Sequence, residues 1–119
     1  MSLLLFVLYL KLRRAAMGNR PFQSHIEGMR LRFLIKSADR KWGRLFIFDN
    51  GSVRSVSGAD HACDAALVWS DRKAALKVML SDTEVAALEA FRAAARGEMK
   101  VEGNVYYIQW FNDGVKLII

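Results

Sequence analysis

Apolar and polar residues alternate over short segments in the middle of the chain, a pattern typical of half-buried β-strands. In residues 30–37, Leu31, Phe33 and Ile35 fall on one face, and basic residues fall on the other. Because successive strand side chains point to opposite faces, this spacing predicts a strand with one buried side. Comparable patterns predict further strands over residues 43–49, 52–57, 64–69 and 99–102.

A tight turn is predicted between the second and third of these strands, at Asn50-Gly51. The favoured two-residue hairpin turn needs positive φ at both central residues, and Asn-Gly adopts it most readily. Residues 43–57 are therefore expected to form a β-hairpin.

The periodicity becomes helical after residue 70. Ser70 and Asp71 can cap one helix, whose apolar residues recur at spacings of three and four. A second helix is predicted to begin at a capping box formed by Ser81 and Glu84 and to end near Gly97. Its apolar stripe consists of Val85, Leu88, Phe91 and Ala95.

The C-terminal segment admits two interpretations. The aromatic residues within 105–111 suit a strand, but a helix that turns Tyr107, Ile108 and Phe111 inward is equally regular. The turn-like tripeptide Asn112-Asp113-Gly114 could end such a helix, or it could make residues 105–119 a hairpin.

The N-terminal segment joins a short apolar run to a basic one. Residues 3–10 are apolar, and Lys11, Arg13 and Arg14 follow them. The run is about half of the roughly 20 residues that a membrane-spanning helix needs. A signal peptide carries its basic residues before the apolar run, which is the reverse of the order here. The segment therefore favours neither a membrane-spanning helix nor a signal peptide.

Three roles remain open for this N-terminal helix. It could pack on its own domain or on a partner subunit as part of a homo-oligomer, and it could lie in a membrane interface through residues 1–14. It could also be an exported leader or an inaccurate start of the chain. Proline suits the first turn of a helix, so Pro21 could open a short second helix that reaches about Gly28.

Strands and helices are segregated along the chain, which predicts an α+β fold with a run of antiparallel strands. The length of 119 residues fits one domain over residues 21–119, preceded by the apolar and basic helix of residues 1–20. The single cysteine, Cys63, excludes an internal disulfide, so a reducing cytoplasm is the default location, with membrane association as an addition.

The positive charge is local rather than general. The chain holds 18 Lys and Arg residues against 12 acids, and four of the basic residues precede the first acid, Glu27. The rest of the chain is nearly neutral. A nucleic-acid-binding domain usually spreads basic residues over its binding face, so we expect no nucleic-acid partner. A basic segment beside an apolar one suits an anionic membrane surface.

The only candidate for a catalytic or metal centre is the pair His61 and Cys63, flanked by Asp60 and Asp64. A single His-x-Cys pair is a weak signal for a metal or for a nucleophile and base. The chain has no glycine-rich phosphate loop, no Gly-x-Ser-x-Gly and no spaced ligand set. We therefore expect no enzyme activity, no catalytic residues, no metal and no cofactor.

Three stretches of the sequence resemble the sterol carrier protein type 2 family. They are Asp64–Asp71, which leads a strand into a helix, the helix end Val78–Ser81, and Gly97–Asn104, which forms a strand before the terminal element. The segments Trp42–Ile47 and Asp49–Gly51 also look like the family's central hairpin. The resemblance covers roughly residues 27–119.

The resemblance implies a sheet of about five strands with helices packed on one face, and an apolar tunnel between sheet and helices. Family members bind sterols, fatty acyl chains, phospholipids or isoprenoid quinones there, and some assist quinone synthesis. Residues 105–119 would then be partly helical and would line or cover the tunnel. The candidate cavity residues are Leu45, Ile47, Leu67, Trp69, Leu76, Met79, Leu80, Leu88, Phe91, Tyr107, Ile108 and Phe111.

Two functional hypotheses follow. The first is non-catalytic binding or carriage of a lipid or another apolar small molecule, in which Trp69, Phe91, Trp110 and Phe111 could stack around the ligand. The second is a protein-interaction module with a filled core, in which the same aromatic residues are ordinary core and the N-terminal helix mediates oligomerisation.

Overall fold

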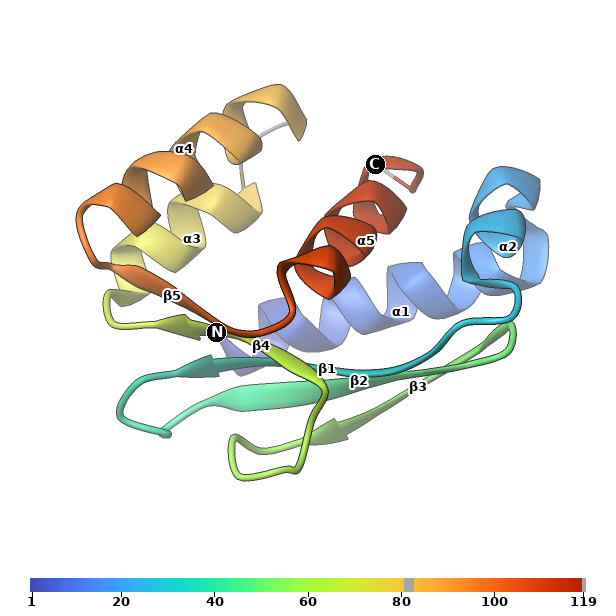
Figure 1. The fold of residues 1–119 in the computed structure, drawn as a ribbon, viewed down its shortest axis with the longest axis horizontal. Helices are drawn as coiled ribbons and strands as arrows, with labels where there is room; N and C mark the ends of the chain where they lie inside the picture. The colour runs from blue at the N-terminus through green and yellow to red at the C-terminus, as the bar shows by residue number, and fades with distance from the viewer. Residues whose placement is uncertain (81–82, 119) are drawn as a thin grey trace.

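The computed structural model describes residues 1–80 and 83–118, and of residues 79–80 and 83–87 only the backbone. A single sheet forms one layer, and the helices of this part of the chain form a second layer on one of its faces (Figure 1). The core lies between the two layers. This arrangement confirms the α+β class with helices packed on one side of the sheet.

The sheet has five strands in the order β3-β2-β1-β4-β5. The two central strands, β1 and β4, run parallel, and the other three pairings are antiparallel, so the sheet is mostly antiparallel as expected. The strands are β1 (Arg30–Ser37), β2 (Gly43–Asp49), β3 (Ser52–Ser57), β4 (Ala65–Trp69) and β5 (Met99–Gly103), close to the five predicted segments.

The predicted turn between β2 and β3 is confirmed. Asn50 has a φ of 45° and Gly51 a φ of 96°, which are the positive values that this turn requires. The Asn50 side chain also accepts a hydrogen bond from the backbone N–H of Gly28, at 2.9 Å. The turn thus fixes the register of the hairpin and ties it to the chain that enters β1.

The helices are α1 (Ser2–Gly18), α2 (Arg20–Ile26), α3 (Arg72–Leu80), α4 (Thr83–Ala95) and α5 (Val105–Lys116). Asn19 caps α2 by accepting a hydrogen bond from the N–H of Phe22, and Pro21 lies in the first turn, as expected. Gly97 follows the end of α4 with a φ of 76°, also as expected. The predicted capping box of Ser81 and Glu84 lies outside the described residues.

The C-terminal segment is a helix, which decides between the two interpretations of the sequence. Asn104 caps it by accepting a hydrogen bond from the N–H of Tyr106, and the tripeptide Asn112-Asp113-Gly114 continues the helix. Gly114 is buried, and the ring of His25 lies about where a side chain would begin, 3.1 Å from an added Cβ. The glycine therefore serves close packing between α2 and α5 rather than a turn.

The N-terminal helix α1 packs on its own domain. It lies across β2 and β3 and also contacts α2. Leu5 and Leu12 on its inner side are 0% and 1% exposed and belong to the same core as the sheet. No helix among the described residues is long and apolar enough to cross a membrane.

The connection between β3 and β4 must cross β2 and β1 to reach its place in the sheet. It passes close to β2, where a Cβ on Gly43 would lie 2.9 Å from the Cα of Ala59. Further along, Cys63 packs against a small second core on the face of the sheet that the helices leave bare. The members of this second core are Leu34, Leu45 and Ala66, with Ile47 and Val68 beside them.

The start of β4 and the end of β5 approach each other so closely that only glycine fits at position 103. Gly103 has a φ of 88°, and an added Cβ would lie 2.5 Å from the carbonyl oxygen of Asp64. We expect Gly103→Ala to lower the free energy of unfolding by more than 2 kcal/mol, because about 1–2 kcal/mol of backbone strain is joined by this clash. Urea denaturation followed by circular dichroism measures the change.

Gly97→Ala is the matched control for that substitution. Gly97 also has a positive φ, of 76°, but nothing lies within 4 Å of an added Cβ. Its loss should be limited to the backbone strain of about 1–2 kcal/mol. Equal losses for the two variants would show that the close approach at Gly103 does not contribute to stability.

Candidate ligand-binding site

The space between the sheet and α5 is filled by aromatic rings. Phe111 of α5 stacks on Phe33 of β1, with ring centroids 4.1 Å apart and planes only 6° from parallel. Phe46 and Phe48 of β2 contact the same ring from the side. All four side chains are at most 4% exposed. The predicted cavity residue Phe111 is therefore part of a packed core directly beneath α5.

The same aromatic group extends to α2. Trp110 meets Phe48 edge to face at 4.9 Å, and the ring of His25 stacks on Trp110 at 4.7 Å. Nε2 of His25 also lies 2.8 Å from the carbonyl oxygen of Trp110, so it donates a hydrogen bond there. These contacts hold the inner side of α5 against both the sheet and α2. We call Phe33, Phe46, Phe48, Trp110 and Phe111 the aromatic core.

Four of the candidate residues do lie between sheet and helices, in the same buried cluster as the aromatic core. Leu67 and Trp69 point to the helix side of β4 and are 9% and 4% exposed, and Ile108 of α5 is 7% exposed. Tyr107 is half-buried and packs against the same cluster. Leu76 on α3 is half-buried as well. The side chains of the other two candidates near α3, Met79 and Leu80, lie outside the described residues.

Two other candidates lie on the wrong face of the sheet. Leu45 and Ile47 belong to the second core, on the side away from the helices, because β2 turns Phe46 and Phe48 toward the helices instead. The expectation that Leu45 and Ile47 line the space between sheet and helices is wrong. Both faces of β2 are apolar in the sequence, so alternation alone could not tell which face the helices cover.

The two candidates on α4 point away from the core. Leu88 and Phe91 are 49% and 74% exposed, whereas Ala93 is 1% exposed and Glu89 is 7% exposed. The buried carboxylate of Glu89 lies 3.3 Å from Nζ of Lys77 and 3.4 Å from Nη1 of Arg92. Within the predicted apolar stripe of α4, Leu88 and Phe91 therefore lie on the outer side of the helix and do not line the interior.

One residue that the sequence did not single out marks an opening beside α5. Val101 of β5 pairs with Leu67, so its side chain points to the helix side of the sheet. It is nevertheless 40% exposed. Both α4 and α5 contact β5, and Met99 next to Val101 on the same face is half-buried. The helix layer therefore leaves part of the apolar surface of β5 uncovered. The predicted alternation of Met99 and Val101 was the available signal.

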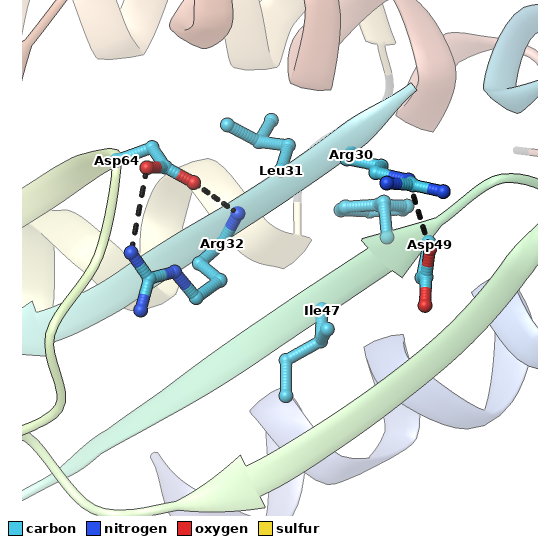
Figure 2. A pocket seen from close by; sticks show the side chains of 7 residues that line it. Arg30, Leu31, Arg32, Ile47, Asp49 and Asp64 are labelled. Carbon is cyan, nitrogen blue, oxygen red and sulfur yellow. Dashed lines mark hydrogen bonds and ion pairs between the residues drawn. The ribbon is translucent and has the colours of Figure 1, made fainter. Parts of the chain in front are cut away.

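Two pockets lie elsewhere in the part of the chain that the structure describes. One, of about 410 Å³, opens where β1 begins and β2 ends, and there Arg30 and Arg32 face Asp49 and Asp64 (Figure 2). The N–O distances are 3.5 Å for Arg30 and Asp49 and 3.6 Å for Arg32 and Asp64, so each cation has its own carboxylate. Another, of about 440 Å³, lies between the end of α1, α2 and Gly51, and four of its six lining residues are polar or charged. Neither pocket offers an apolar interior.

The side chains of the candidate catalytic group interact with other parts of the chain rather than with one another in the contacts that the structure shows. Nε2 of His61 forms a hydrogen bond with the carbonyl oxygen of Ser57, and Asp60 forms an ion pair with Arg40. Asp64 accepts a hydrogen bond from the N–H of Arg32 at 2.8 Å. No group of His, Cys, Asp and Glu suited to a metal occurs within residues 1–80 and 83–118. Each of these side chains thus has a structural partner of its own.

Burial raises the pKa of the Cys63 thiol, with smaller opposing effects from neighbouring charges. A raised pKa means less thiolate at pH 8, and the thiolate is the reactive form. We expect iodoacetamide to alkylate Cys63 several-fold more slowly in the folded protein than in the urea-unfolded chain, as measured by mass spectrometry over time. Equal rates in the two states would contradict the effect of burial.

The aromatic core should dominate stability. Phe111→Ala removes a ring that touches three strand residues, and we expect a loss of about 3–5 kcal/mol in the free energy of unfolding. Phe91→Ala is the control, because that ring is 74% exposed, and its loss should stay within about 0.5 kcal/mol. Urea denaturation of both variants checks the contrast, which a large loss for Phe91→Ala would overturn.

Comparison with known proteins yields similarity of fold. No protein-family model and no curated protein sequence matches the chain. Among solved structures, one described as "UbiJ-SCP2 Ubiquinone synthesis protein" is 14% identical with a TM-score of 0.64, over 94% of this chain and 84% of that one. A sterol carrier protein 2 is 13% identical with a TM-score of 0.63, over 94% of this chain and 93% of its own.

A third match is to part of a much larger protein. The sec-alkylsulfatase Pisa1 from a Pseudomonas species is 13% identical with a TM-score of 0.51, and the match covers 81% of this chain but 14% of the sulfatase. Identities this low establish the fold alone. The chain has the fold of sterol carrier protein 2 domains, as the motifs in its sequence predicted.

Proposed function

We propose that this protein binds an apolar small molecule of the lipid class, without catalysing a reaction, against the uncovered part of the helix side of β5, next to β4. The observation that carries this proposal is Val101, which lies on the helix side of the sheet beside Leu67 and is 40% exposed. An apolar side chain on the face that a fold normally buries offers a surface for an apolar ligand.

The proposed location of the ligand follows from the space that side chains already fill between the sheet and the helices. The aromatic core occupies the space beneath α5, so a ligand would lie beside α5 rather than under it. There it would meet Leu67, Met99 and Val101 from the sheet and Tyr107 from α5. These side chains are apolar or aromatic, and methionine adapts its shape to different partners.

Binding of this kind needs no acid, base or nucleophile. Burial of apolar surface contributes about 25 cal/mol per Å², or about 0.8 kcal/mol for each CH₂ group. An alkyl or isoprenoid chain therefore suits the site better than a compact polar substrate. Two proteins of the same fold are described as a sterol carrier and as a ubiquinone synthesis protein, which supports a sterol-like, acyl or quinone-type ligand. A cytoplasmic location remains part of this proposal.

Native mass spectrometry of protein purified from cells tests the proposal first, and a mass adduct of lipid size is expected. The second test is titration with a fluorescent long-chain fatty acid. Val101→Lys should weaken its binding at least tenfold, because the charged side chain would occupy the proposed surface and resist burial.

Val56→Lys is the matched control for that titration. Val56 is 44% exposed and also lies on an edge strand, β3, but it pairs with Leu45 on the face away from the helices. Its substitution should leave binding unchanged. The proposal would be wrong if neither a lipid adduct nor fatty-acid binding were found. It would also be wrong if Val101→Lys and Val56→Lys weakened binding equally.

The second hypothesis, an interaction module with a filled core, is favoured by one observation. The ring of Phe111 is only 4% exposed and packs tightly on Phe33, which is how an ordinary core looks. On this hypothesis neither lipid adduct nor fatty-acid binding would be found. The titration therefore separates the two hypotheses.

A further inference from the structure

Helix α1 has a second apolar side that faces outward. A helix advances about 100° per residue, so residues that recur every three, four or seven positions share one side. Leu3, Leu10 and Met17 recur every seven residues and are 72%, 43% and 70% exposed. Val7 lies on the same side and is 38% exposed, and Phe6, which is 40% exposed, lies at the edge of this side, where its ring packs against the guanidinium of Arg44. This side is opposite the one that buries Leu5 and Leu12. We call these five exposed residues the outer stripe.

The outer stripe is flanked by basic residues that have no acidic partner. Arg13 and Arg14 lie on the same side of α1, and Lys11 and Arg20 are close to them along the chain. All four are exposed. None of the four forms an ion pair with a carboxylate of the described residues, although seven pairs form elsewhere. The outer side of α1 therefore combines exposed apolar area with unneutralised positive charge.

We propose that α1 docks on the surface of an anionic lipid membrane and lies parallel to it. Leu3, Val7 and Leu10 then enter the boundary between headgroups and acyl chains, and the basic residues at the other end of the helix contact lipid phosphates. Interfacial helices of this composition bind by burying their apolar side and by attraction to anionic lipids. This inference does not depend on the proposed ligand, since it concerns a different surface.

Charge distinguishes a membrane from a second copy of the chain as the occupant. In a symmetric dimer each surface meets its own copy. Two outer stripes would then place four unpaired cations, Arg13 and Arg14 of each copy, in one interface with no acid in either α1 to offset them. Like charges across an interface are unfavourable, whereas an anionic lipid surface attracts every one of these cations.

The inner side of α1 determines how the test must be designed. Leu5 and Leu12 are part of the core, so deleting the helix would unfold the domain rather than only remove the docking surface. Substitutions must be confined to the outer stripe. The triple variant Leu3→Asn, Val7→Asn and Leu10→Asn removes exposed apolar area while the inner side stays intact.

Sedimentation with sucrose-loaded vesicles measures the docking, with vesicles of phosphatidylcholine alone and with phosphatidylglycerol added. The intact protein should bind the anionic vesicles, and its affinity should fall as salt rises. The triple variant should bind at least tenfold more weakly. Arg13→Gln with Arg14→Gln should bind about 25-fold more weakly, because each cation near the surface contributes a factor of about five.

Two control variants match these changes elsewhere on the molecule. Leu88→Asn with Phe91→Asn removes exposed apolar side chains from α4, and Arg72→Gln with Lys73→Gln removes two exposed cations from α3. Both should keep the affinity of the intact protein. Circular dichroism confirms that every variant is folded.

The outcomes of this experiment are distinct from those of ligand binding. Failure of the folded protein to bind anionic vesicles at low salt would overturn the docking proposal, whatever the fatty-acid titration gives. So would control variants that weaken binding as much as the α1 variants do. A dimer in solution that the triple variant converts to a monomer would show that a second copy covers the outer stripe instead.

Discussion

The contact between Phe33 and Phe111 holds the two layers of this domain together. Phe33 lies in the central strand β1, and Phe111 is the residue of α5 that rests on it, with ring centroids 4.1 Å apart. Because Phe46 and Phe48 close around the same ring, α5 is fixed over the middle of the sheet. The position of α5 bears on the proposed function, since a helix held at the centre leaves the edge strand β5 partly uncovered at Val101. The filled core and the proposed binding surface both follow from the packing of Phe111 on Phe33.

Local sequence patterns were sufficient for the strands and for the turn at Asn50 because both depend on neighbouring residues. They were insufficient where two faces were equally apolar. In β2, Leu45 and Ile47 alternate with Phe46 and Phe48, and alternation cannot say which pair meets the helices. The outcome depends on the crossover from β3 to β4, which covers the other face near Leu45. The path of this crossover is a property of the topology, and it cannot be read from the sequence pattern of β2.

Helix α4 shows a different difficulty, since its buried side contains a charged residue, Glu89, beside small alanines such as Ala93. Glu89 can be buried because Lys77 and Arg92 lie within 3.4 Å of its carboxylate, and Lys77 belongs to another helix. A buried charge needs such partners, and the sequence of α4 alone shows only one of them. Leu88 and Phe91 therefore looked like the inner stripe although they are exposed. The likeness to sterol carrier proteins correctly indicated the fold, but it could not place individual side chains of the cavity.

For helix α1 the sequence allowed two roles, and there is a physical reason why it could not decide between them. Its run of apolar residues suited packing on its own domain and contact with an outside partner, and the structure shows why both patterns are present at once. Leu5 and Leu12 satisfy the core, so the outer stripe is not needed for folding. Exposed apolar area of this kind on a folded domain, placed beside cations without acidic partners, carries a cost in water that folding does not explain. Because folding does not require the outer stripe, this surface of α1 is the natural place to look for a function that does not involve the interior of the domain.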